Sequence, residues 1–77
     1  MNLQMRGGWV LLRKVEDADA DGVVLAAGPD TGLKAGAKVI YRRATGTMGI
    51  DGKEMLVVED GDIIAEIVEE GDAKQEA

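Results

Sequence analysis

Five short apolar runs alternate with glycine-containing or charged connections along the chain. The runs are WVLLRKV (9–15), VVLAA (23–27), AKVIYRR (37–43), EMLVVE (54–59) and DIIAEIVEE (62–70). Short runs bounded by turn residues are typical of the strands of an all-β sandwich or barrel. The pattern therefore predicts a small antiparallel β structure.

Two connections refine this prediction. The pair Asp51-Gly52 stands between apolar runs, and both residues tolerate positive φ, so a β-hairpin is expected around Gly52 in a β-meander. The last run is compatible with two structures, because its apolar residues also share one face of a helix. Those residues are Ile63, Ile64, Ile67 and Val68. Pattern alone leaves helix and strand equally open there.

The chain has 77 residues, which corresponds to one domain. We assign residues 1–70 to this domain and expect the charged segment 71–77, which has no apolar periodicity, to be a disordered acidic tail. A domain of this size buries only about 60% of its unfolded surface and is marginally stable alone. The absence of Cys and His excludes disulfides and thiolate or imidazole metal sites, which leaves calcium or oligomerisation as added sources of stability.

The net charge of −6 disfavours nucleic acids and anionic membrane surfaces as partners. No apolar run approaches the roughly 20 residues of a membrane span, and the start MNLQMRGG lacks the apolar stretch of a secretory signal, so we expect a cytoplasmic protein. Trp9 and Tyr41 are the only aromatic residues. Trp9 fits the core or a surface covered by a neighbouring subunit, and the enrichment of aromatics at interfaces favours the second.

The stretch VEDADADGVVL resembles the first half of an EF-hand calcium loop. Loop positions 1, 3, 5, 6 and 8 would be Asp17, Asp19, Asp21, Gly22 and Val24. Position 12, which needs a bidentate Glu, is Gly28, and the flanking segments are rich in β-branched residues instead of helical. We interpret the stretch as a solvated acidic turn and predict no metal site.

No pattern predicts catalysis or a cofactor. His, Cys and Ser are absent, the threonines have no basic partner at a diagnostic spacing, and no phosphate-binding glycine motif occurs. The basic cluster Lys38, Arg42 and Arg43 would be split between the two faces of a strand, which is typical of solvated positions. We therefore expect a protein that is not an enzyme.

Four segments together resemble the GroES-like co-chaperonin family, the lids of bacterial chaperonins. LKAGAKVIYRR (33–43) resembles the family strand vkvGDxVxy, with Ala37 at the usual acidic position. GIDGKEMLVVEDGDIIAEIVE (49–69) is similar to the ending xxDGxEYLvvxExDILAvie, with Met55 replacing an aromatic residue. MNLQMRGGWVLLRK (1–14) and VVLAAGP (23–29) are similar to the first strand and to the strand ending VLAVG. Met5, Arg6 and Gly8 stand where the family has Pro, Leu and Asp.

The chain departs from the family in its connections. A long glycine-containing loop that docks on the chaperonin normally precedes the VLAVG strand, and here only EDADADG (16–22) separates Val15 from Val23. The roof hairpin is likewise reduced to PDTGLKAG (29–36). Two alignments with the family are possible. In the first, residues 23–28 form the barrel strand and the docking loop is deleted. In the second, the docking element is retained and the strand that follows it is lost. The docking element would then be Gly22, Val23, Val24 and Leu25. The first is favoured because a small barrel cannot spare a strand.

The resemblance implies an irregular antiparallel β-barrel in a sevenfold ring, and it resolves the last run as a turn at residues 60–63 followed by a strand. In such a ring the first strand, Val10 to Lys14, pairs with the last strand of the next subunit, Ala65 to Glu69. The implied interface residues are Leu3, Trp9, Val10, Leu12, Ala65, Ile67 and Val68. The implied function is to cap a chaperonin and assist protein folding. The alternative is a scaffolding ring of the same fold that binds no chaperonin.

Overall fold

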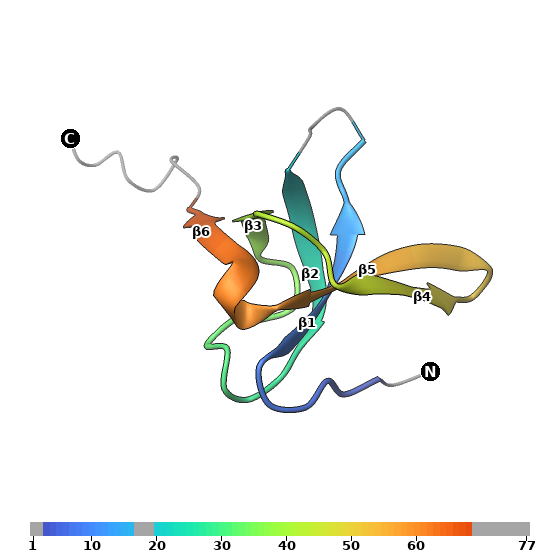
Figure 1. Cartoon of the computed structure of the whole chain (residues 1–77), viewed down its shortest axis with the longest axis horizontal. Helices are drawn as coiled ribbons and strands as arrows, with labels where there is room; N and C mark the ends of the chain where they lie inside the picture. Colours follow the sequence, from blue (N-terminus) through green and yellow to red (C-terminus); the bar gives the residue numbers. More distant parts are fainter. Residues whose placement is uncertain (1–2, 17–19, 69–77) are drawn as a thin grey trace.

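The computed structural model describes residues 3–16 and 20–68, and these form six β-strands and one short 3-10 turn (Figure 1). The strands are β1 (Trp9–Lys14), β2 (Asp21–Ala27), β3 (Lys38–Tyr41), β4 (Gly46–Ile50), β5 (Lys53–Glu59) and β6 (Ile63–Ile67). The turn η1 (Asp60–Asp62) leads directly into β6. The prediction of an all-β domain is confirmed, and the last apolar run is a strand preceded by a turn.

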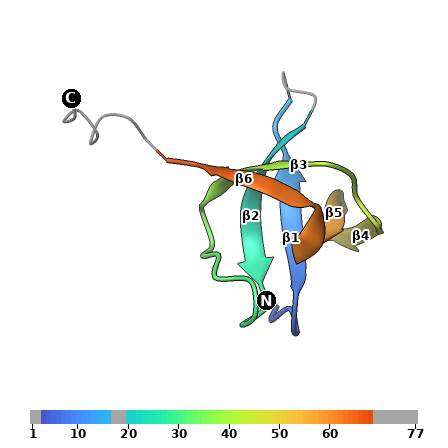
Figure 2. The same ribbon diagram turned by 60° about the vertical axis from the view of Figure 1, so that its left-hand side comes forward.

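All six strands belong to one antiparallel sheet in the order β4-β5-β1-β2-β3-β6. β1 is central and pairs with β2 on one side and β5 on the other. The predicted irregular antiparallel β-barrel is not closed in a single subunit, because β4 and β6 are the two edges of the sheet. The β4–β5 hairpin and β6 extend in opposite directions from the body of the sheet, so the two edges do not meet (Figures 1 and 2).

The core lies on one face of the sheet and draws its side chains from four strands. Its members are Val10, Leu12, Val24, Val39, Tyr41 and Val58, all buried. Burying an aliphatic side chain of this size contributes about 1.5 to 3 kcal/mol. Leu11 points to the opposite face and is only 2% exposed, so β1 is covered on both faces. Aliphatic side chains thus form nearly the whole core, as the shortage of aromatic residues requires.

The hairpin expected around Gly52 is present, but its first strand was not predicted. Asp51 has φ 52° and Gly52 has φ 78°, the conformation that a two-residue turn of type I′ requires. The turn joins β5 to β4, whose sequence GTMGI contains two glycines and no apolar run. The run at 37–43 pairs instead with β2 and β6, so the chain is not a simple meander.

The predicted acidic tail, residues 71–77, lies outside the described residues. The only helical turn in the described part of the chain is the three-residue η1, so no helix there has the length or hydropathy to span a membrane.

Candidate functional site

β6 presents an unpaired apolar edge. On one side its residues pair with β3, in the register Lys38↔Ile67 and Ile40↔Ala65. On its other side no strand of the described chain lies next to it. Ile64 is 63% exposed and Val68, directly after the strand, is 68% exposed. An exposed apolar edge of this kind is a template for pairing with another chain.

An ion pair fixes the point at which β6 begins. Arg42 donates from Nη2 and Nε to Oδ1 of Asp62, at 2.8 and 3.2 Å, and its backbone N–H donates to the carbonyl oxygen of Asp62 at 2.7 Å. Asp62 is 7% exposed, whereas the Arg42 side chain is 67% exposed. The sequence analysis placed Arg42 on a solvated strand face and missed this contact. No local pattern relates two residues that are twenty positions apart.

The segment before β1 is held against the end of β2 by backbone contacts. The carbonyl oxygen of Gly7 accepts from the N–H of Asp30 at 3.0 Å, and that of Gly8 accepts from the N–H of Asp60 at 2.8 Å. Gly28 allows this close approach, since a Cβ there would overlap the carbonyl oxygen of Gly7. Residues 3–6 continue from this anchor outside any strand, with Leu3 exposed.

The structure corrects part of the predicted interface. The side chains of Val10 and Leu12 have no exposed surface in a single subunit, so they belong to the core and offer nothing to a neighbour. The backbone from Trp9 to Leu12 already pairs with β5, and that from Val10 to Lys14 pairs with β2. The predicted strand exchange through Val10 to Lys14 therefore has no free ladder position at Val10, Leu11 and Leu12, which have strand partners on both sides within the subunit.

The other predicted interface residues fall into two groups at the surface. Leu3 and Trp9 flank the segment 3–8, with about a third of each side chain exposed. Ala65, Ile67 and Val68 lie in or just after β6, where Ala65 and Val68 are exposed and Ile67 is half-buried.

The predicted docking element is a strand in the middle of the sheet. Gly22, Val23, Val24 and Leu25 lie in β2, where Gly22 and Val24 are buried. β2 pairs with β1 and with β3, so this segment cannot leave the sheet to bind a partner. The structure thus agrees with the alignment in which residues 23–28 form a strand, since all but Gly28 lie in β2.

The second half of the calcium-loop pattern is a strand. Asp21 begins β2, and the residues that would supply the second half of the calcium site are extended in that strand. Asp17 and Asp19 lie outside the described residues. Within residues 3–16 and 20–68, no group of three acidic side chains is arranged to hold a metal ion.

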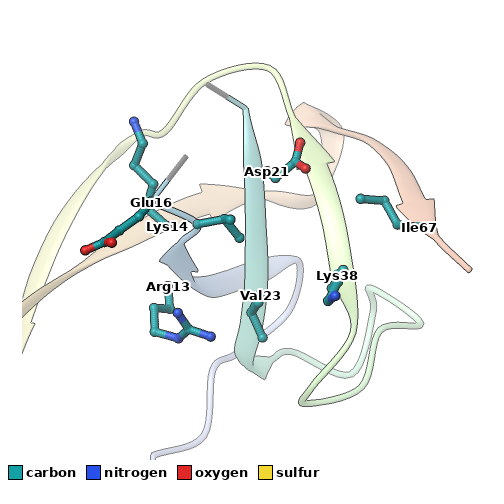
Figure 3. Close-up of a pocket in the computed structure, with 8 residues that line it drawn as sticks. Arg13, Lys14, Glu16, Asp21, Val23, Lys38 and Ile67 are labelled. Carbon is teal, nitrogen blue, oxygen red and sulfur yellow. The ribbon is translucent and has the colours of Figure 1, made fainter. Parts of the chain in front are cut away.

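An open groove of about 610 Å³ lies beside the connection between β1 and β2 (Figure 3). Arg13, Val23, Lys38 and Ile67 form one row across it, because each is the cross-strand neighbour of the next. Glu16 and Asp21 also line the groove. Cationic, acidic and aliphatic groups thus meet at one shallow surface.

A family model, the Chaperonin 10 Kd subunit, matches residues 2–67, which include every strand of the sheet. This chain belongs to that family. The chain is also 30% identical over 79 aligned positions to the Co-chaperonin GroES of Dinoroseobacter shibae, an alignment that covers 88% of this chain and 77% of that protein. The resemblance inferred from the four sequence segments is confirmed.

The connection between β1 and β2 is short. It spans only residues 15–20 and is closed at its base by a hydrogen bond of 3.1 Å from the N–H of Val15 to the carbonyl oxygen of Asp21. The groove lies directly beside this connection.

Proposed function

We propose that this chain is the subunit of a ring-shaped co-chaperonin that caps a chaperonin during assisted folding. Membership of the Chaperonin 10 Kd subunit family supports the co-chaperonin assignment. The observation that supports the ring is the unpaired edge of β6, with Ile64 and Val68 exposed on and beside it.

The ring contact joins β6 of one subunit to residues 3–8 of the next. This segment has no strand partner in its own subunit, and its far end is anchored at Gly7 and Gly8, so it is presented in a defined position. Pairing would satisfy the outward N–H and C=O groups of β6 and cover Leu3, Ile64 and Val68. Each Å² of apolar surface covered contributes roughly 25 cal/mol. By resemblance, the ring has seven subunits.

Native mass spectrometry tests the ring. We expect one dominant species at seven times the subunit mass. A stable monomer at micromolar concentration would contradict the ring and, with it, the capping function.

Capping is expected to need few residues of each subunit. Ordering a docking segment costs roughly 1 to 2 kcal/mol of free energy per residue. Because the connection spans only residues 15–20, it can cover only a small area of the chaperonin, and the free-energy cost of ordering it is correspondingly small. Several weak contacts made together by one ring still give useful avidity. The contact itself is expected at this connection and the adjoining groove.

Binding to a chaperonin is measured by co-sedimentation and by the ATPase rate of the chaperonin in the presence of nucleotide. We expect the ring to co-sediment with the chaperonin and to alter its ATPase rate. The variant Ile64→Asp should not assemble, and we therefore expect it neither to co-sediment nor to alter the ATPase rate. An intact ring that does not bind at high concentration would leave the alternative function, a scaffolding ring of the same fold. The short acidic stretch 16–22 is the observation that favours that alternative.

The remaining expectations stay predictions. They are a cytoplasmic location, no catalytic activity, no cofactor, and no binding to nucleic acids or membranes.

A further inference from the structure

β4 is an edge strand without the features that usually protect an edge. It pairs only with β5, and its sequence GTMGI contains neither charge nor proline, in a chain of which 31% is charged. Natural edge strands are commonly protected by lysine, proline or a bulge, which block pairing with other chains. β4 has a regular register with β5 and therefore lacks the bulge as well.

Neither packing nor backbone conformation within the subunit requires the two glycines of β4. Neither Gly46 nor Gly49 has a positive φ, and a Cβ added at either position would meet no atom within 4 Å. Glycine weakens a strand, and in a strand it often marks a place where another chain approaches closely. The open space beside these glycines is available to a second molecule.

The backbone of β4 offers its outward groups in a definite register. The turn at Asp51 and Gly52 makes Ile50 and Lys53 the closing pair of the hairpin. Because hydrogen-bonded and non-hydrogen-bonded pairs alternate along an antiparallel ladder, the N–H and C=O groups of Thr47 and Gly49 point away from β5.

We propose that β4 pairs antiparallel with β4 of a second copy of this chain, across a twofold axis that passes beside Met48. In this register Thr47 lies opposite Gly49 of the second copy, Gly46 lies opposite Ile50, and Met48 faces its own equivalent. Every bulky residue except the central methionine thus faces a glycine. The outward groups of Thr47 and Gly49 form the hydrogen-bonded pairs, and no like charges oppose each other.

This contact is separate from the proposed ring contact. β4 and β6 are at opposite ends of the strand order, so both edges can be occupied at once. A five-residue strand buries little surface, which makes one such contact weak. Several such contacts between two rings would act together, so we expect pairs of rings to form reversibly at high protein concentration, as a minor species at twice the mass of the dominant ring.

Disulfide trapping tests the register directly, because the chain contains no cysteine. In the variant Met48→Cys, the two thiols lie in a non-hydrogen-bonded pair with Cα atoms about 4.5 Å apart, which a disulfide can bridge. Mild oxidation should therefore give a covalent dimer on a non-reducing gel. The matched control is Thr47→Cys. In this register its two copies lie diagonally across the strands, with Cα atoms farther apart than the roughly 7 Å limit for a disulfide, so little dimer should form.

A second variant separates pairing from folding. Gly49→Pro removes the outward N–H on which the proposed pairing depends. That N–H makes no bond to β5, and proline is tolerated at such positions of edge strands, so far-UV circular dichroism of the subunit should be unchanged. Met48→Cys combined with Gly49→Pro should therefore give several-fold less covalent dimer than Met48→Cys alone.

The proposal is overturned by equal trapping at positions 47 and 48, by no trapping at 48 in a folded protein, or by trapping that Gly49→Pro leaves unchanged. None of these outcomes bears on the ring, whose mass is measured independently.

Discussion

Asp62 and Gly28 show how single residues position the surfaces of this protein. Asp62 is buried and receives Arg42 from the end of β3, which fixes the place where β6 leaves the turn η1. Gly28 lets residues 6 and 7 approach the end of β2 more closely than any side chain would permit. One residue therefore positions the β6 edge, and the other positions the segment proposed to pair with it.

Removing the exposed member of the ion pair should cost more stability than removing the buried one. Arg42→Ala leaves the carboxylate of Asp62 buried without its partner, at a cost of about 2 kcal/mol. Asp62→Ala leaves a largely exposed Arg42 that water can solvate, at a cost of about 1 kcal/mol. Urea unfolding at a fixed protein concentration measures both values. A larger loss for Asp62→Ala than for Arg42→Ala would contradict this account.

Gly28→Ala should destabilise the subunit by about 1 to 3 kcal/mol, because the new methyl group overlaps the backbone of Arg6 and Gly7. Gly46→Ala is the matched control, since a methyl group there meets nothing within 4 Å and the residue has no positive φ. Thermal unfolding of the two variants should show a lower Tm for Gly28→Ala alone. Equal Tm values for Gly28→Ala and Gly46→Ala would mean that the N-terminal segment can move away from position 28 without loss of stability.

The β4–β5 hairpin depends more on its turn than on its side chains. β4 contributes no residue to the buried core cluster, and its outer end extends away from the body of the sheet (Figure 1). The left-handed conformations of Asp51 and Gly52 are therefore what hold the two strands in register.

Replacing Gly52 by Ala should destabilise the hairpin by about 1 kcal/mol, the cost of a left-handed backbone for a residue with a Cβ. The effect should be local, with amide hydrogen exchange faster in β4 and the outer half of β5 and unchanged in β1 and β2. Asp51→Gly, which keeps the turn geometry accessible, is the control and should leave exchange in β4 nearly unchanged. Faster exchange throughout the sheet would show that the hairpin does not open on its own.

The whole molecule is an open sheet with two free edges and a short anchored segment before β1. Such a small domain is marginally stable alone, and pairing at the edges is the available route to further burial. Assembly is therefore the property of the complete molecule that should respond most strongly to changes at β6.

Deleting residues 65–77, which include most of β6, should abolish assembly, whereas deleting residues 71–77 should not. Because the longer deletion also removes the partner of β3, Ile64→Asp provides a milder test. Ile64 is 63% exposed, so the substitution should leave the subunit folded while it places a charge at the proposed contact. Native mass spectrometry and far-UV circular dichroism measure the two properties. Full assembly of Ile64→Asp would exclude the β6 edge as the ring contact.

Particular residues show how far prediction from the sequence extended. The apolar runs located β1, β2, β3 and β5, and Asp51-Gly52 located the hairpin turn. β4 was missed because its two glycines interrupt the alternation of apolar and polar residues that identifies a strand. The two-residue turn nevertheless implies a strand on each of its sides. Val10 and Leu12 were assigned to an interface because an apolar strand has the same sequence whether it lies in a core or between subunits.

The sequence by itself determined the strand-forming segments other than β4, the turn chemistry, the family and the shortness of the β1–β2 connection. These properties depend on local backbone preferences and on the order of motifs, and both can be read from the amino-acid sequence alone. Only the tertiary structure decided that β1 is central, that β4 and β6 are free edges, and that Arg42 meets Asp62. Pairing between distant strands is selected by the packing of the whole core, so no single stretch of sequence specifies which edges remain open.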